Sequence, residues 1–482
     1  SEQTKDGGLQ GRLEKSVLRR ADSDGPVRGQ NVPIVCNFDE DLLALFSEVN
    51  YWEKFQGEFS IPYLAHDLCT KREQLRIMRE NVMLIVRAYN DIIADIDAEE
   101  RRLFVDHMRR LDRRIQQGMT KLTWLSKNTI DMYVRDCCSS CADVHRVILS
   151  FKEAKRLIDR QSRIVNNALF VKIDKNVIYD DTMFEAKQEE HRANIKGVLS
   201  EGFESIMSTL RRIFKNFKEG STEVQREWRS QIVQMDRRME QVLKHAVKRS
   251  LQEFGRAING DSKTEPQTLF TTRIILEPAS QGTRVTYKPS LVSLTHSVNL
   301  IAKEIISIVL AVPRLRIQNF ELVSVVGEED AKPAALKLTD PYYDVIANDD
   351  DILRLVVQAM NGMSSSATEL QKYMTYWDKY KALWEMDKEF FIRKYAKSSK
   401  TPVQFDNDIS RYRHQQGEII SEASNHTINF VRVDCTVLKD GLVGHCLQYQ
   451  TRLTGLLNQN GAQELQDIYQ LFEDSRANLT VS

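Results

Sequence analysis

The feature that most constrains this chain is a helical spacing of apolar residues that recurs along much of its 482 residues. The spacing is clearest after Ser221, a residue type suited to begin a helix, where apolar residues follow at intervals of 4, 4, 3, 4, 3 and 4. They are Val224, Trp228, Ile232, Met235, Met239, Val242 and Ala246. Because an α-helix has about 3.6 residues per turn, these side chains share one face, which predicts an amphipathic helix.

The same spacing predicts helices elsewhere in the chain. One follows Asp39, which can cap a helix start, and a second follows Pro62 as far as Ile96. A third is expected to end at Gly118, in a left-handed cap. Further helices are expected at about 129–169, within 182–260, at 290–312, 349–363, 366–396, 406–422, 437–457 and 462–477.

One segment has the character of β-structure. Residues 269–276 and 284–288 are rich in β-branched and aromatic side chains, and they flank a turn-forming segment, Pro278–Gly282. A chain of 482 residues is also too long for a single hydrophobic core. The expected fold is therefore mostly α, an elongated series of helical bundles with one small inserted β-hairpin. The expected division is a flexible lead-in at 1–32, helical bundles at 33–170 and 171–262, the hairpin at 263–289, a third bundle at 290–400 with an acidic loop at 324–348, and the start of a further bundle at 401–482.

The charge balance gives no overall field for attracting nucleic acid, because Lys and Arg together number 68 and so do Asp and Glu. No secretory signal is visible, and the most apolar window, 290–312, carries His296, Lys303 and Glu304, which favours a buried helix over a membrane span. Seven dispersed cysteines suit a reducing compartment. We therefore expect a cytoplasmic chain that has neither nucleic acid nor membrane as its partner.

Motifs for catalysis or cofactor binding were sought and not found. No G-x-x-x-x-G-K-[ST] loop is present, and Gly220-Ser221 is interpreted as an ordinary helix start. Cys137, Cys138 and Cys141, with His145 one turn further, are the most suggestive metal cluster, but no second Cys/His pair accompanies them. We expect buried, inert thiols there, and no catalytic, cofactor-binding or metal residues in this chain.

The charge is unevenly placed along the chain. Residues 205–256 hold twelve Lys and Arg against six Asp and Glu, a net charge of 12 − 6 = +6, whereas residues 328–351 hold two Lys against eight acids, a net charge of 2 − 8 = −6. The two stretches could neutralise each other, or both could be solvated. We predict instead that the basic stretch binds an acidic partner, with Arg211, Arg212, Lys215 and Lys218 as the candidate partner-binding face. The locally basic run Arg109 to Arg114 is interleaved with acids and is weak evidence for a partner.

Several runs together resemble the tail of dynein heavy chains. They are residues 37–43, 48–54, 61–62, 76–90 and 99–104, with Leu122-Thr123-Trp124 after them. Later segments continue the similarity: 270–290, 313–315, 340–346, and the aromatic positions Tyr373, Trp377, Tyr380, Trp384, Phe405 and Tyr412. Two of these runs, Tyr51-Trp52-Glu53-Lys54 and Arg79-Glu80-Asn81-Val82, resemble the corresponding sequences of the ciliary (axonemal) members in particular.

This resemblance implies a non-catalytic tail (stem) segment. Its expected partners are dynein intermediate and light chains, other heavy chains, and docking proteins or the doublet microtubule, in the axoneme of a cilium or flagellum. The motor ATPase of the family would lie outside this chain. A helical rod that tethers or coats membranes has the same composition and stays an alternative.

Overall fold

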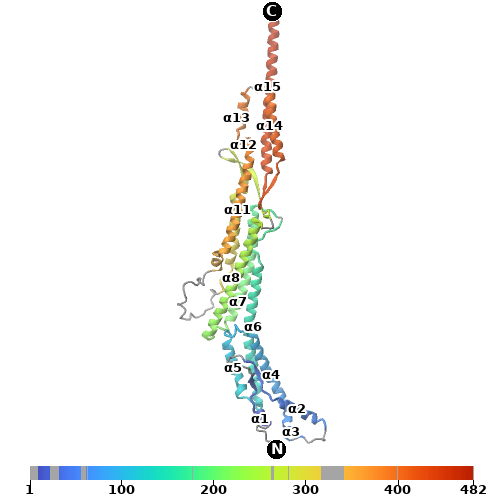
Figure 1. Cartoon of the computed structure of the whole chain (residues 1–482), viewed down its shortest axis with the longest axis vertical. Coiled ribbons are helices and arrows are strands. Elements are labelled where there is room, and N and C mark those ends of the chain that lie inside the picture. Colours follow the sequence, from blue (N-terminus) through green and yellow to red (C-terminus); the bar gives the residue numbers. More distant parts are fainter. Residues whose placement is uncertain are drawn as a thin grey trace. The chain divides into compact units, whose positions relative to one another are not determined.

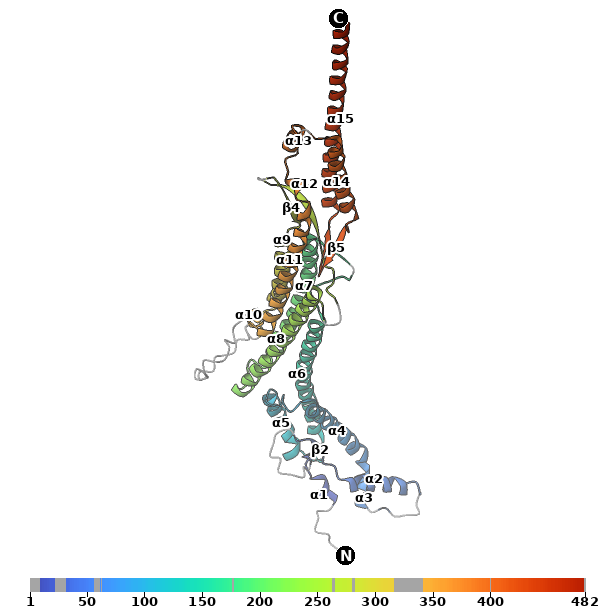
Figure 2. The same ribbon diagram turned by 45° about the horizontal axis from the view of Figure 1, so that its top comes forward.

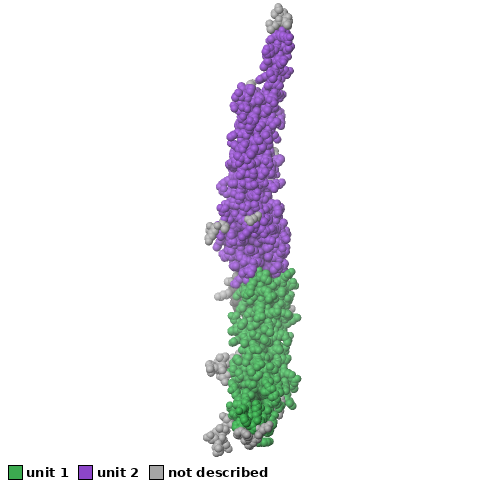
Figure 3. Space-filling view, turned by 90° about the vertical axis from the view of Figure 1, so that its right-hand side faces the viewer, with its two compact units in different colours: residues 1–164, 201–240, 313–335 green, residues 165–200, 241–312, 336–482 purple. Residues whose placement is uncertain are grey.

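A computed structural model describes residues 9–21, 32–55, 61, 63–175, 177–261, 265–279, 282–315, 341–398 and 400–480 (Figure 1). The fold is mostly α with a small amount of β-structure, as predicted. Contacts group the chain into two compact units, coloured in Figure 3. Unit 1 holds residues 1–164, 201–240 and 313–335, and unit 2 holds residues 165–200, 241–312 and 336–482. The finer division into bundles stays a prediction.

Unit 1 is built from amphipathic helices. Its elements are α1 (Leu9–Leu13), β1 (Leu18–Arg20), β2 (Ile34–Cys36), α2 (Glu40–Trp52), α3 (Tyr63–Thr70), α4 (Arg72–Asp95) and α5 (Val105–Thr120), with most of α6 (Lys127–Asn167) and parts of α7 (Asp181–Phe214) and α8 (Thr222–Asn259). The apolar stripe of α4 is buried at Leu75, Val82 and Tyr89, and Ile115 of α5 is fully buried. Burial of these stripes supplies the main favourable free energy of folding.

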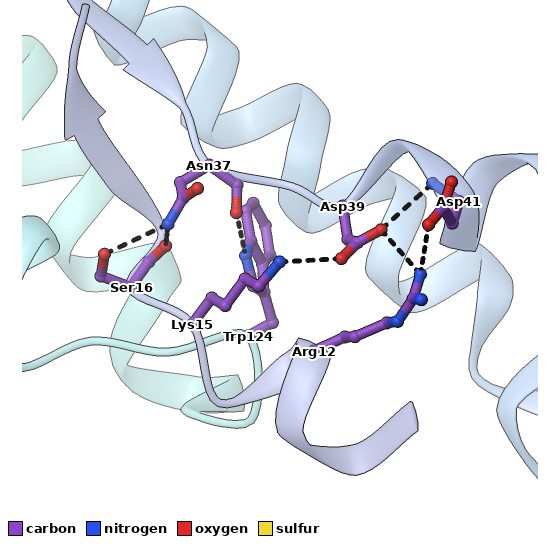
Figure 4. A network of polar contacts seen from close by, with 7 residues as sticks. All are labelled: Arg12, Lys15, Ser16, Asn37, Asp39, Asp41 and Trp124. Atoms are coloured by element: carbon purple, nitrogen blue, oxygen red, sulfur yellow. Dashed lines mark hydrogen bonds and ion pairs between the residues drawn. The ribbon is translucent and has the colours of Figure 1, made fainter. Parts of the chain in front are cut away.

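The segment expected to be a flexible lead-in is partly ordered. β1 pairs antiparallel with β2, and a polar network, drawn in Figure 4, holds the preceding turn in place. Lys15 and Arg12 both pair with Asp39, at 2.9 and 3.1 Å, and Asp39 also caps α2 by accepting from the Asp41 amide, as predicted. Trp124 Nε1 donates to the Asn37 carbonyl at 3.0 Å. Charge pairing therefore compensates for the scarcity of apolar residues in this segment.

Gly118 does not cap α5, contrary to the prediction. It lies inside the helix, which continues to Thr120, and it is buried. A Cβ added at Gly118 would collide with the hydroxyl of Tyr133 on α6, which donates to the Ile115 carbonyl at 2.8 Å. The glycine is needed for close approach of two helices, and not for a left-handed turn.

Unit 2 contains a sheet larger than the predicted hairpin. β3 (Phe270–Ala279) and β4 (Gly282–Lys288) form the expected hairpin, but β3 also pairs in parallel with β6 (Val431–Asp434), and β5 (Asn425–Ile428) completes the order β4-β3-β6-β5. The turn between β5 and β6 places Asn429 at a φ of 51°, a conformation that asparagine tolerates. This second hairpin has no clear signal in the sequence, because each of its strands has only four residues.

α9 (Leu291–Ser307), with the short helix η1 (Ile308–Ala311), is the predicted buried helix. Its face bearing Leu294, Val298 and Ile301 is buried, and it lies beside α11 (Asp350–Tyr376) in Figures 1 and 2. Leu291–Ala311 is also the one segment among the described residues that is apolar and long enough to cross a membrane, by composition alone; half of its most apolar window is buried. Such a core helix is expected to pass that compositional test.

Other helix boundaries differ from the predictions. The single helix expected from Pro62 to Ile96 is divided into α3 and α4. The helices expected at 349–363 and 366–396 are instead α11, the short helix η2 (Trp377–Tyr380), α12 (Ala382–Glu385) and α13 (Lys388–Ala396). α10 (Tyr342–Ala347) precedes them, and the rest of the predicted acidic loop lies outside the described residues. α14 (Pro402–Ser421) packs beside α15 (Thr436–Thr480), a single helix where two were expected. The interruption expected between 457 and 462 does not occur, and Gly461 is accommodated inside the helix, where an isolated glycine costs only about 1 kcal/mol.

Candidate partner-binding site

The four residues of the candidate partner-binding face lie at one place in unit 1. Arg211 and Arg212 are in the last turn of α7, and Lys215 and Lys218 are in the turn that leads to α8. All four side chains are exposed, while Ile213, Phe214 and Phe217 between them are buried. The apolar residues fix the backbone, so the basic residues are held at the surface.

Aromatic packing anchors this turn. The ring of Phe217 stacks on Trp228 of α8 with 5.2 Å between centroids, and it contacts Phe104 and Phe151 at 5.8 and 6.5 Å. Gln225 Nε2 donates to the carbonyls of the turn at Lys218 and Gly220, at 3.1 and 3.2 Å. The buried aromatic rings and these hydrogen bonds therefore fix the shape of the turn between α7 and α8.

Beside this turn is a hollow of about 580 Å³, which we name the basic hollow. Two segments line it, α5 and the α7–α8 turn. The lining residues are Asp106, His107, Arg109, Arg110, Arg113, Lys215, Asn216, Glu219 and Gly220. The structure therefore brings one member of the candidate face, Lys215, next to three arginines that are about 100 residues earlier in the sequence. Arg211, Arg212 and Lys218 do not line the hollow.

Asp106, one of the acids that line this hollow, already has hydrogen-bond partners within the chain. The backbone amide of Ser221 donates to Asp106 Oδ2 at 2.7 Å, and Arg109 approaches Asp106 Oδ1 at 3.4 Å. Partial burial opposes ionisation of Asp106, but these hydrogen bonds and the charges of Arg109 and Arg110 together hold its pKa below the usual value. Asp106 is therefore a structural carboxylate that ties the α8 start to α5. It also places a negative charge at the Gly220-Ser221 helix start, where a bound phosphate would lie.

Two cations of the hollow keep their hydrogen-bonding capacity. Asp112, which precedes Arg113, turns away to accept from Arg20 and Tyr89 at 3.0 and 2.6 Å. Within the part of the chain that the structure describes, neither Arg113 nor Lys215 forms an ion pair. Four cations against Asp106 and Glu219 give the lining a net charge of 4 − 2 = +2.

The histidine of the hollow stays neutral. His107 packs edge-on against Phe217 with 5.7 Å between ring centroids, and its Nδ1 is buried without a hydrogen-bond partner. Burial, reinforced by the charge of Arg110, lowers the pKa of His107 from its ordinary value. The ring of His107 therefore contributes an uncharged part of the lining of the hollow.

The two oppositely charged stretches do meet in unit 2, in part. Lys248 pairs with Asp351 at 2.7 Å, and Lys244 pairs with Asp349. These contacts join α8 to the start of α11 and compensate two of the basic residues counted above. The two charged stretches therefore neutralise each other where α8 meets the start of α11. Lys215 and its basic neighbours in unit 1 take no part in these two ion pairs.

The cysteine cluster has the environment of packed thiols. Cys137 and Cys141 are buried on α6, and burial raises their pKa values to about 11 and about 12, which disfavours the thiolate that binds metal. His145 is 2.7 Å from Asp95, on α4. Among the residues that the structure describes, no group of three or more His, Cys, Asp or Glu side chains is placed to hold a metal ion.

The place of Arg109, Arg110 and Arg113 in the hollow could not be predicted from the sequence. Acids interleave with them in the sequence, which is typical of a solvated helix face. The structure shows that Asp106 accepts from Ser221 and that Asp112 accepts from Arg20. Asp112 does not line the hollow, and Asp106 with Glu219 offsets only two of the four lining cations. No local pattern could reveal this, because both partners come from distant parts of the chain.

The fold is that of a mostly helical protein, and unit 1 carries a basic surface at the α7–α8 turn. Residues 2–133 match the family model described as dynein heavy chain, N-terminal region 1. Over 92% of its length the chain is 35% identical to the Dynein-1-beta heavy chain of the flagellar inner arm I1 complex of Chlamydomonas reinhardtii. Over 96% it is 32% and 31% identical to Dynein axonemal heavy chain 2 of Mus musculus and Homo sapiens.

The chain belongs to the dynein heavy chain family and corresponds to the N-terminal tail region of its axonemal members. The predicted resemblance is therefore confirmed. The chain spans about a tenth of the length of the curated relatives it matches. The expected location, the axoneme, agrees with the flagellar and axonemal names of these relatives.

Proposed function

We propose that this chain is a non-catalytic tail segment of a ciliary dynein heavy chain that serves assembly of the arm. It joins heavy chains, binds intermediate and light chains, and contributes to docking on the doublet microtubule, while the ATPase motor lies in other parts of the family's polypeptide. The similarity to axonemal heavy chains over nearly the whole chain carries this proposal. A fold of long packed helices suits a mechanical role, because packed helices resist deformation.

The exposed basic residues at the end of α7 support a contact role. Arg211, Arg212, Lys215 and Lys218 gather at one turn, which buried aromatic residues hold in a fixed shape. A partner with acidic residues would be attracted to this face, and the attraction would weaken as salt shortens the Debye length from about 10 Å at 0.1 M to about 3 Å at 1 M.

The test is assembly of the 482-residue chain with purified dynein intermediate chains and, in a parallel arm, with liposomes. We expect binding to the intermediate chains that weakens with salt, and no sedimentation with liposomes. Reversal of all four basic residues to Glu should abolish the salt-dependent part of binding. Binding to liposomes in place of intermediate chains would favour the membrane-rod alternative and contradict the proposal. Unchanged assembly of the reversed variant at every salt concentration would show that the face is only solvated.

A further inference from the structure

The basic hollow offers more than a general positive charge, because its cations come from two elements and converge on one space. Arg109, Arg110 and Arg113 come from one side of α5, and Lys215 comes from the α7–α8 turn. An Arg guanidinium can bind a carboxylate through two parallel hydrogen bonds, which gives geometric specificity as well as attraction. An exposed helix face lacks such convergence.

We propose that the basic hollow is the specific recognition site of this surface and that it binds the carboxylate side chains of an acidic peptide segment from a protein partner. Arg113 and Lys215 are its principal donors. This inference rests on the proposed function, since it narrows the partner contact from the whole basic face to one hollow within it.

The internal contacts of the hollow select these two donors. Arg109 is committed to Asp106 at 3.4 Å and approaches Glu223 at 3.7 Å, and Arg110 Nε donates to the Asp106 carbonyl at 3.3 Å. Arg113 and Lys215 have no ion pair among the described residues, and the nearest acid in the sequence, Asp112, is engaged by Arg20. A ligand therefore does not have to displace an internal acid to reach them.

The same contacts favour a carboxylate over a phosphate group. The carboxylate of Asp106 already lies at the start of α8, where it accepts from the Ser221 amide, so a phosphate at this helix start would have a carboxylate beside it. The side-chain cations remain as donors, and a guanidinium group pairs with a carboxylate through two parallel hydrogen bonds. A volume of about 580 Å³ has room for more than one acidic side chain, so a peptide with neighbouring Glu or Asp residues fits the site.

The experiment measures the binding of a fluorescein-labelled hexaglutamate peptide to the 482-residue chain by anisotropy, with hexaglutamine and a phosphoserine peptide as comparisons. The test variant combines Arg113→Gln with Lys215→Gln. The matched control combines Arg211→Gln with Arg212→Gln, which removes the same charge from the same corner but outside the hollow. Far-ultraviolet circular dichroism of each variant checks the fold. If the double variant does not fold, Lys215→Gln alone, in an exposed turn position, replaces it.

The expected result is that hexaglutamate binds, that the hollow variant loses about tenfold in affinity, and that the control variant stays within about twofold of the original chain. Equal losses in the two variants would indicate diffuse attraction and overturn the proposal. So would phosphoserine binding in the hollow without hexaglutamate binding, or no hexaglutamate binding at all. The proposed function is tested separately: absence of intermediate-chain assembly contradicts it, whatever the hexaglutamate result.

Discussion

Arg314 is a deeply buried charged side chain of unit 1, with 2% of its side-chain surface exposed. It donates to Asp236 Oδ2 at 2.8 Å and pairs with Glu240, while the Leu315 amide donates to Asp236 Oδ1 at 3.0 Å. Burial disfavours the charged guanidinium, but the two carboxylates outweigh that effect and raise the pKa of Arg314. One side chain thus ties the segment after η1 to α8 within unit 1.

We expect Arg314→Ala to lower the free energy of unfolding by about 3–5 kcal/mol, because Asp236 would be left buried without its counter-charge. The matched control is Arg238→Ala, which removes an exposed pair with Asp159 at 2.6 Å and should cost about 0–1 kcal/mol. Urea denaturation of both variants provides the measurement. Equal small effects would mean that the buried network adds no net stability.

Asp39 makes part of the stability of the N-terminal segment depend on pH. Its burial alone would raise its pKa, but the hydrogen bond and charge of Lys15 and the charge of Arg12 outweigh burial and lower the pKa. A carboxylate with a lowered folded-state pKa contributes stability that is fully present above its unfolded value of about 3.9, and that is lost as pH falls through the folded value.

Asp39→Asn is the informative variant, because asparagine can still cap α2 but carries no charge. The difference in midpoint unfolding temperature between the original chain and this variant should be constant from about pH 5 to pH 7 and should shrink as the pH falls below about 3.9 through the folded pKa of Asp39. Asp41→Asn, at an exposed acid that also pairs with Arg12, should show little difference at any pH. A difference that persists at pH 2 would contradict the charge-based explanation.

At the scale of the elements, the junction after α11 shows why helix ends are harder to predict than helices. The aromatic spacing Tyr373, Trp377, Tyr380 and Trp384 predicts burial, and both tryptophans are indeed buried, with 0% and 8% exposed. They do not share one regular helix, because Trp377 lies in η2 and Trp384 in α12. The spacing of the aromatic residues therefore predicts which side chains are buried, but it does not predict where the helix is interrupted between Trp377 and Trp384.

We expect Trp377→Ala and Trp384→Ala each to cost about 3–5 kcal/mol of stability, since each would leave a cavity the size of an indole ring. Tyr376→Ala, at a residue of α11 with 45% of its surface exposed, is the control and should cost distinctly less. Thermal unfolding of the chain would reveal the difference. An unchanged transition for either tryptophan variant would contradict its assignment to the core.

Much of the helical fold could be predicted from the sequence because the apolar stripes are long. α6 was expected at about 129–169 and runs Lys127–Asn167. What escaped prediction depends on contacts between distant segments: β6 pairs with β3 across more than 150 residues, and Gly118 is set by Tyr133. The lining of the basic hollow depends on the same kind of contact, so the sequence pointed to Lys215 but not to Arg113. Lys215 has a local basic context, but Arg113 becomes available only because Arg20 binds Asp112.

At the scale of the whole molecule, the absence of a phosphate-binding loop in the sequence predicts that this chain alone neither binds nor hydrolyses ATP. The one helix start considered for phosphate, at Ser221, already has its amide bound by Asp106. Calorimetric titration of the 482-residue chain with Mg²⁺ and ATP should give no binding heat above that of dilution. Stoichiometric binding would contradict the assignment of the chain as a non-catalytic tail.

α15 combines two kinds of helix in one continuous element. Leu442, Cys446, Tyr449 and Leu453 are buried, but residues 462–477 are exposed throughout, including Leu465, Tyr469 and Phe472. In this second part the backbone hydrogen bonds lack tertiary packing, so only local helix propensity opposes their opening.

The consequence is a gradient of amide hydrogen exchange along a single helix. Amides at 462–477 should exchange at least about a hundredfold faster than those at 442–453, because they open by local fraying while the packed amides require disruption of unit 2. Mass spectrometry after a deuterium pulse resolves the two segments, and equal protection would disprove the gradient. Slower exchange at 462–477 on addition of another subunit would locate where that subunit covers the helix.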